Sequence, residues 1–160
     1  AGFKPGVTKQ DVERAVGDGT FEDLLVRFDA KPGECYFIPG GLVHAIGEGT
    51  SVYEVQQSSD TTFRLYDWGR VGADGRPRQL HVKDGLAAMD ITLPPPVPSQ
   101  GVKCSYFEFY KAGGGSRREA EDAKRWRVVF DPAADDCFLL PPGEAAEIPS
   151  GAWVTVGPTN

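Results

Sequence analysis

Glycine and proline interrupt this chain so often that many turns and short strands are favoured over long helices. The 160 residues include 20 glycines and 13 prolines, about a fifth of the chain. Glycine supplies the left-handed backbone of tight turns, whereas proline fixes φ and has no amide hydrogen to donate. Frequent Gly and Pro therefore predict a mainly β chain, with short strands separated by turns.

Helical patterning is confined to two short stretches. In residues 7–28, Thr8 can cap a helix whose apolar residues follow at i, i+3 and i+4 spacing, and Gly17 is expected to end it. A second short helix is expected to begin at Thr20. Residues 81–89 predict one further short helix.

Most of the remaining apolar residues form short runs typical of β-strands. The expected strands are 35–38, 51–56, 61–66, 104–110 and 126–130. Between them, the proline-rich stretch 93–99 should be stiff and extended, because proline restricts the backbone. We therefore expect two domains, 1–92 and 98–160, joined by this linker.

Charge and composition exclude several classes of partner. The net charge is −6 and no cluster of Lys and Arg is present, so neither nucleic acid nor an anionic membrane is an expected partner. No run reaches the roughly 18 apolar residues of a membrane span. The three cysteines are widely spaced and form no CxxC, which predicts reduced thiols and a cytoplasmic location.

One segment, residues 33–44, combines a strand, a turn and a histidine. Pro39 is expected to end the strand, Gly41 to allow a tight turn, and His44 to lie on the strand that follows. A neutral imidazole at such a position can bind a divalent metal, so His44 is a candidate metal ligand.

A weak internal repeat links this segment to the end of the chain. Residues 34–41 align without gaps on residues 136–143, and both end in a proline followed by a glycine turn. In this register His44 corresponds to Ala146. We therefore expect two related β-units, of which only the first carries a metal ligand.

The pattern G-x5-P-x-G-x2-H in residues 33–44 resembles the second motif of the cupin superfamily, small jelly-roll β-barrels. A longer match runs from about Gly2 to Ile91, with its most specific part at 43–47 and 55–70, and includes Arg78-Gln-Leu-His. It resembles the class I mannose-6-phosphate isomerases, which are zinc-dependent double cupins. This resemblance implies that the chain contains the end of a first, catalytic cupin and, after it, a second, metal-free cupin-like unit. It implies the conversion of mannose 6-phosphate to fructose 6-phosphate through a cis-enediol, with a hexose 6-phosphate as substrate.

The resemblance also implies roles for three residues. His44 matches the zinc-ligating histidine, Arg64 the active-site arginine, and Asp60 the acidic residue four positions before that arginine. On one ideal strand, residues 60 and 64 would face the same side about 13 Å apart. We therefore expect Asp60 and Arg64 to make two contacts on one pocket wall and not to form a pair.

The match lacks one family feature, a Gln-x-His pair and a glutamate that complete the zinc site. A catalytic zinc site needs three or more protein ligands, and His44 is one. We therefore expect the other ligands upstream of Ala1. The chain is interpreted as the carboxy-terminal half of the isomerase, with the missing amino-terminal half as its partner. The general base is not assigned.

Two other functions are compatible with a cupin pattern. The chain could be a non-catalytic sugar-binding or regulatory cupin module, or a different metal-dependent cupin enzyme such as an oxygenase or epimerase. Oxygenase cupins place two or three histidines close together, and the two histidines here are far apart in sequence. The second of them, His81, is interpreted as a packing or capping residue at the start of the helix expected over residues 81–89.

Overall fold

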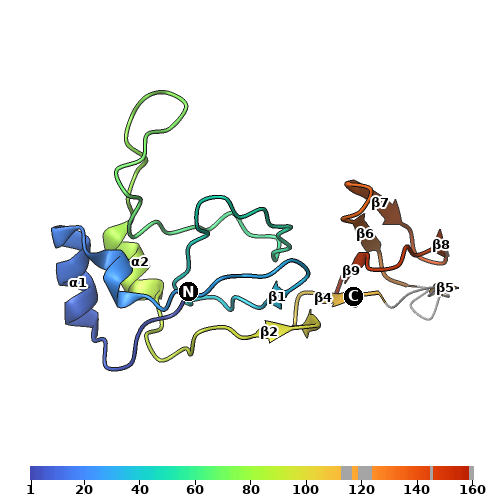
Figure 1. The fold of residues 1–160 in the computed structure, drawn as a ribbon, viewed down its shortest axis with the longest axis horizontal. Coiled ribbons are helices and arrows are strands. Elements are labelled where there is room, and N and C mark those ends of the chain that lie inside the picture. The colour runs from blue at the N-terminus through green and yellow to red at the C-terminus, as the bar shows by residue number, and fades with distance from the viewer. Residues whose placement is uncertain (113–116, 119–123, 145, 159–160) are drawn as a thin grey trace. The chain divides into compact units, whose positions relative to one another are not determined.

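The computed structural model describes residues 1–112, 117–118, 124–144 and 146–158, and Figure 1 shows their fold. The elements are helix α1 (Lys9–Asp18), the single 3-10 turn η1 (Phe21–Leu24), strand β1 (Cys35–Tyr36), helix α2 (Val82–Ala88), and then strands β2 (Pro98–Ser99), β3 (Gly101–Lys103), β4 (Glu108–Lys111), β5 (Arg117–Arg118), β6 (Arg127–Asp131), β7 (Asp136–Leu140), β8 (Ala146–Glu147) and β9 (Trp153–Val156). In the described ranges, no helix is long enough and apolar enough to cross a bilayer.

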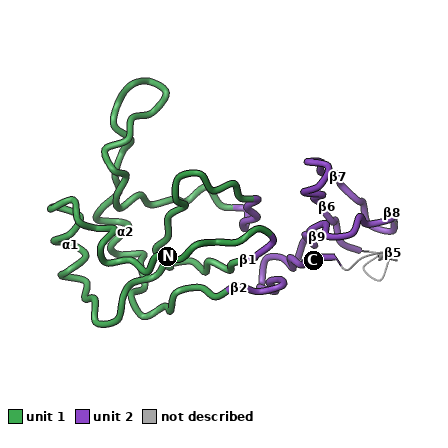
Figure 2. The backbone as a smooth tube through the Cα atoms, in the orientation of Figure 1, with its two compact units in different colours: residues 1–32, 36–52, 59–97 green, residues 33–35, 53–58, 98–160 purple. Residues whose placement is uncertain are grey.

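The chain divides into two compact units, coloured separately in Figure 2. Unit 1 comprises residues 1–32, 36–52 and 59–97, and unit 2 comprises residues 33–35, 53–58 and 98–160. Every helix in the described residues belongs to unit 1, whereas unit 2 contains the larger of the described sheets.

The first helix begins as the sequence predicts and ends two residues later than expected. Thr8 Oγ1 accepts a hydrogen bond from the Asp11 amide (3.2 Å), and the Asp11 carboxylate accepts one from the Thr8 amide (3.0 Å), which completes a capping box. The helix runs past Gly17 to Asp18, because Gly19 adopts the left-handed conformation (φ 74°) that closes a helix. The second expected helix is the single turn η1.

The helices of unit 1 pack around a small apolar core. Its buried side chains come from the amino terminus, α1, η1 and the segments on either side of α2: Phe3, Val12, Phe21, Leu65 and Met89. Helices α1 and α2 contact each other. Leu65 therefore ties the segment that carries Arg64 to the helical part of the unit.

Three of the expected strands fall in a region with almost no regular structure. Within 35–38 only Cys35–Tyr36 is a strand, and residues 37–81 contain no helix or strand, so the strands expected at 51–56 and 61–66 are not formed. A β-strand is stable only where neighbouring strands satisfy its amide and carbonyl groups. The described residues offer 51–56 and 61–66 no such neighbour, which explains the error.

Unit 2 is built on a five-stranded antiparallel sheet in the order β3-β4-β9-β6-β7. Tyr110 and Val129 lie opposite Val154 in the pairing of β4 and β6 with β9. One face of the sheet carries the core, with Val129 fully buried and Val154 2% exposed. The strand expected at 126–130 is confirmed in β6, whereas of 104–110 only the last three residues are in a strand, β4.

The opposite face of this sheet is covered by aromatic rings. Phe109 stacks on Trp153 (4.8 Å between ring centroids), and Tyr53, from the short segment 53–58, stacks on Phe130 (4.3 Å) and lies 6.2 Å from Phe109. The burial of Tyr53 raises the pKa of its hydroxyl above the ordinary value. Residues of the expected strand 51–56 therefore pack onto the sheet of unit 2 through a side chain, without forming a strand.

Candidate functional site

The turn before His44 forms as the sequence predicts. The Leu42 amide donates to the Pro39 carbonyl (3.1 Å), and Gly41 has a φ of 88°, which L side chains rarely adopt. A Cβ at Gly41 would lie 3.1 Å from the carbonyl oxygen of Ala88. The glycine is therefore required both by its backbone angle and by the close approach of the residue that ends α2.

Two backbone hydrogen bonds fasten the His44 turn to the rest of unit 1. The Asp90 amide donates to the Gly41 carbonyl (3.0 Å), and the Gly2 amide donates to the Val43 carbonyl (2.9 Å). Between these two anchors, Leu42 is buried. The turn is thus held at three consecutive residues, immediately before the histidine.

The His44 side chain is exposed, and its contact with the backbone selects one tautomer. Nδ1 lies 3.0 Å from the carbonyl oxygen of Leu42. Because a carbonyl oxygen can only accept, Nδ1 must carry the hydrogen, and Nε2 keeps its lone pair. In metal-binding histidines, the ring nitrogen that does not bind the metal usually donates a hydrogen bond of this kind. The arrangement suits His44 Nε2 for coordination.

The described residues do not by themselves fit a complete zinc site. No group of three or more His, Cys, Asp or Glu side chains in the described ranges is close enough to hold a metal ion. One imidazole falls short of the three protein ligands that a catalytic zinc requires. No reaction step is therefore derived through a metal from these residues.

Arg64 is half-buried and is held by its backbone as well as by its side chain. Its Nη1 donates to the Gln79 carbonyl (3.1 Å), its amide donates to Nδ1 of His81 (3.2 Å), and its carbonyl accepts from the His81 amide (2.8 Å). The neighbouring Leu65 is in the core of unit 1. An arginine held in this way is a fixed cation, which is what the stabilisation of a developing anion requires.

A cluster of charged residues that the sequence did not single out surrounds the buried Asp67. Arg78 donates two hydrogen bonds to this carboxylate, one of them from Nε at 2.7 Å, and Nη2 of Arg70 lies 3.3 Å away. The pKa of Asp67 lies below its ordinary value, chiefly because of the hydrogen bonds from Arg78, and the charges of Arg70 and Arg64 lower it further. Arg64 therefore belongs to a region where three guanidinium groups act on one carboxylate.

Asp60 is exposed, and the structure gives no support for its expected geometry. Residues 60 and 64 lie in a stretch without a strand, so the spacing argued from an ideal strand does not apply. His44, Asp60 and Arg64 all belong to unit 1. The site roles of these three residues stay predictions.

The chain contains a second counterpart of the His44 turn besides the repeat found in the sequence. The Glu144 amide donates to the Pro141 carbonyl (3.2 Å), so the repeat over 136–143 does end in the expected turn. The same hydrogen bond, at 3.1 Å, joins Ala152 to Pro149, with Gly151 at a φ of 84°. Counted from the turn glycine, the position of His44 corresponds there to Val154. The similarity between Ile38-Pro-Gly-Gly-Leu and Ile148-Pro-Ser-Gly-Ala is the signal that could have revealed it.

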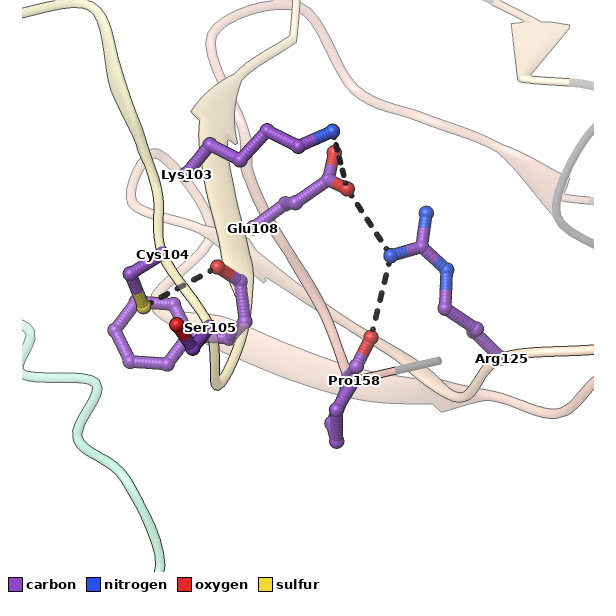
Figure 3. A pocket seen from close by; sticks show the side chains of 8 residues that line it. Lys103, Cys104, Ser105, Glu108, Arg125 and Pro158 are labelled. Carbon is purple, nitrogen blue, oxygen red and sulfur yellow. Dashed lines mark hydrogen bonds and ion pairs between the residues drawn. The ribbon is translucent and has the colours of Figure 1, made fainter. Parts of the chain in front are cut away.

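Unit 2 contains a pocket of about 390 Å³, shown in Figure 3, which none of the three predicted site residues lines. Its charged residues satisfy one another: Glu108 Oε1 lies 3.0 Å from Lys103 Nζ and 3.1 Å from Arg125 Nη1. Lys103 and Arg125 together lower the pKa of Glu108. This mutual pairing is what an ion network that stabilises the fold requires.

Comparison with known proteins places these features in context. No protein-family profile matches the chain. It is 40% identical, over 119 residues, to the mannose-6-phosphate isomerase ManA of Bacillus subtilis, and 37% identical, over 87 residues, to the mannose-6-phosphate isomerase of Streptococcus mutans. These matches cover 65% and 54% of this chain, but 37% and 28% of the two relatives. The chain thus spans between 27% and 37% of the length of the curated relatives it matches.

The fold agrees with the same relationship. The crystal structure of a mannose 6-phosphate isomerase from Bacillus subtilis superposes with a TM-score of 0.63 at 23% identity, covering 95% of this chain and 55% of the other. The expectation of a mainly β, cupin-type fold with a small helical part is confirmed by this match. In sequence and in fold, this chain is similar to mannose-6-phosphate isomerases.

Proposed function

We propose that this chain is part of a mannose-6-phosphate isomerase, which interconverts mannose 6-phosphate and fructose 6-phosphate. The observation that carries the proposal is the sequence relationship to several proteins of that name at 36–40% identity. The fixed position of Arg64 in unit 1 supports it, because an aldose–ketose isomerase must stabilise a negative charge that develops on the sugar.

In the proposed reaction, a base removes the proton from C2 of mannose 6-phosphate and a cis-enediol forms. Returning a proton to C1 gives fructose 6-phosphate, so no oxidant or second substrate is consumed. We assign Arg64 to the enediolate oxygen or to the sugar phosphate, since its guanidinium is permanently charged. Asp60 is proposed to line the same pocket. The base is not among the residues we assign.

Zinc is the proposed cofactor, with His44 Nε2 as one ligand. The tautomer set by the Leu42 carbonyl supports this role. The remaining ligands are proposed to come from the amino-terminal part of the isomerase, because the resemblance assigns one ligand, His44, within this chain. In this proposal residues 1–92 complete the catalytic cupin, and residues 98–160 form the metal-free unit.

We also propose a cytoplasmic location for the enzyme. Cys35, Cys104 and Cys137 are all free thiols, as expected in a reducing compartment.

The test is a conversion assay on the full-length protein that carries this chain. Wild-type protein should convert mannose 6-phosphate to fructose 6-phosphate, and Arg64→Ala should lower kcat by about 10²-fold or more, the scale for losing one charge-stabilising group. Arg64→Lys is the matched control, because it keeps the charge and loses the planar donor group. A wild-type protein that binds hexose 6-phosphate without converting it would instead indicate a sugar-binding module.

A further inference from the structure

His81 occupies the cap position of α2, but its side chain does not cap the helix. The residue has φ −119° and ψ 51°, and its ring makes no hydrogen bond to the first turn. Of the two roles expected from the sequence, packing or capping, the capping contact is therefore not formed. The ring instead points back to the segment that carries Arg64, and it meets the ring of Phe63 edge-on, at 6.4 Å between centroids.

Two hydrogen bonds of opposite direction join His81 to Arg64. The Arg64 amide donates to Nδ1 of His81, and the His81 amide donates to the Arg64 carbonyl. An amide can only donate, so Nδ1 must be the unprotonated nitrogen, and the neutral ring carries its hydrogen on Nε2. Both backbone groups of Arg64 are therefore fixed by one residue, and one of these bonds depends on the imidazole.

Helix α2 reinforces this connection one turn later. A Cβ added at Gly85 would lie 2.7 Å from Cδ2 and 2.9 Å from Cγ of Leu65, so the helix approaches this segment as closely as a glycine allows. The Arg64 side chain bonds in turn to the Gln79 carbonyl, just before the helix. Residues 79–85 therefore hold the backbone and the side chain of Arg64 and contact its neighbour Leu65.

The other end of the same helix holds the turn before His44. The Asp90 amide, two residues beyond α2, donates to the Gly41 carbonyl, and the carbonyl of Ala88 closes over Gly41. One seven-residue helix thus fixes Arg64 at its beginning and the His44 turn at its end.

We propose that His81 is a positioning residue, which holds Arg64 in the place required for the isomerisation through the bond from the Arg64 amide to Nδ1. The proposal rests on the proposed function, because the role of Arg64 comes from it. The imidazole is needed for its acceptor and not for acid–base chemistry. An asparagine side chain, whose amide oxygen lies near the position of Nδ1, should therefore replace it, whereas alanine and glutamine should not.

The first experiment measures the connection without using activity. In the full-length wild-type protein, the nitrogen-15 spectrum of His81 should show the Nε2-protonated tautomer, and the Arg64 amide should exchange slowly with deuterium. His81→Ala should accelerate that exchange at least tenfold, while His81→Asn should stay close to wild type. A Nδ1-protonated His81, or an Arg64 amide unaffected by His81→Ala, would overturn the connection.

The second experiment measures kcat and KM of the full-length protein, with melting temperature as the control for folding. We expect His81→Ala and His81→Gln to lower kcat about tenfold with zinc content unchanged, and His81→Asn to restore it. Equal kcat in folded His81→Ala and wild type would overturn the positioning role. An inactive wild type would instead overturn the proposed function, and the exchange measurement would then still decide whether the connection exists.

Discussion

The turn at Pro39 in unit 1 and the turn at Pro149 in unit 2 have the same hydrogen bond and the same left-handed glycine, yet they lead to opposite surroundings. Three residues beyond the glycine, the first turn presents the exposed His44. The second places Val154 in the centre of a sheet, where it is 2% exposed. The two turns share one backbone motif. The neighbouring strands therefore determine whether the residue after the turn is buried in a core or exposed at a candidate site.

The two units differ in the same way as a whole. In unit 2 the strand after the turn is paired on both sides, by β4 and β6, and its apolar side chains are covered. In unit 1 the residues after the turn form no strand, and many apolar side chains remain exposed: Phe28, Phe37, Ile46, Val52, Phe63, Val71 and Leu80. Unit 2 also exposes large apolar side chains, at Tyr106, Trp126 and Leu139, but none of them lies on β9.

Removing the imidazole should produce the largest difference between the two turns. In the full-length protein we expect His44→Ala to abolish both the bound zinc and the isomerase activity, because a catalytic site rarely tolerates the loss of one of three ligands. Elemental analysis and the conversion assay measure the two effects. Val154→Ala, at the matching position of unit 2, is the control and should leave about one equivalent of zinc. Full zinc occupancy in His44→Ala would remove His44 from the ligand set.

The exposed apolar residues of unit 1 should make the isolated 160-residue chain self-associate. Unpaired segments and uncovered apolar side chains offer surfaces for a second copy. Size-exclusion chromatography should show oligomers, and hydrogen exchange should be slow in β6 and β9 and fast over residues 44–63. Addition of the amino-terminal part of the isomerase should restore a monodisperse species. A compact monomer with a single cooperative melting transition would contradict this expectation.

The sequence predicted features that depend on neighbouring residues and missed features that depend on residues far apart in the chain. Local signals were sufficient for the Thr8 cap and the turn at Gly41, because the residues that make them are neighbours in the chain. The strands expected at 51–56 and 61–66 were wrong, since an apolar run cannot show whether a partner strand exists. The bonds from His81 to Arg64 and from Arg78 to Asp67 were missed, because they join residues 11 to 17 positions apart through side-chain geometry.

A smaller effect is expected on stability: a valine-to-alanine change should lower the free energy of unfolding more in unit 2 than in unit 1. Val154→Ala removes two methyl groups from a fully packed core and should lower the free energy of unfolding by about 2 kcal/mol. Val52→Ala is the matched variant in unit 1, where the side chain is 56% exposed, and should change it by less than about 0.5 kcal/mol. Denaturant unfolding monitored by tryptophan fluorescence measures both. Equal effects would mean that Val52 is covered in solution.

The smallest expected effect concerns acid, and it compares the two ion clusters. The pKa values of Asp67 in unit 1 and Glu108 in unit 2 are both lowered in the folded chain, the first mainly by Arg78 and the second by Lys103 and Arg125. A lowered folded-state pKa means that the stabilisation is complete above the ordinary carboxyl value. It is lost as the pH falls from that value through the lowered one.

Between pH 7 and about pH 3, the melting temperature should therefore fall less in Asp67→Asn than in wild type, because the variant has already lost this contribution at pH 7. Glu108→Gln should show the same change more weakly, since its side chain is 27% exposed against 6% for Asp67, and solvent screens the pair. Asp29→Asn, at an exposed aspartate, is the control and should follow wild type. An Asp67→Asn chain with wild-type acid sensitivity would show that the pairing with Arg78 does not stabilise unit 1.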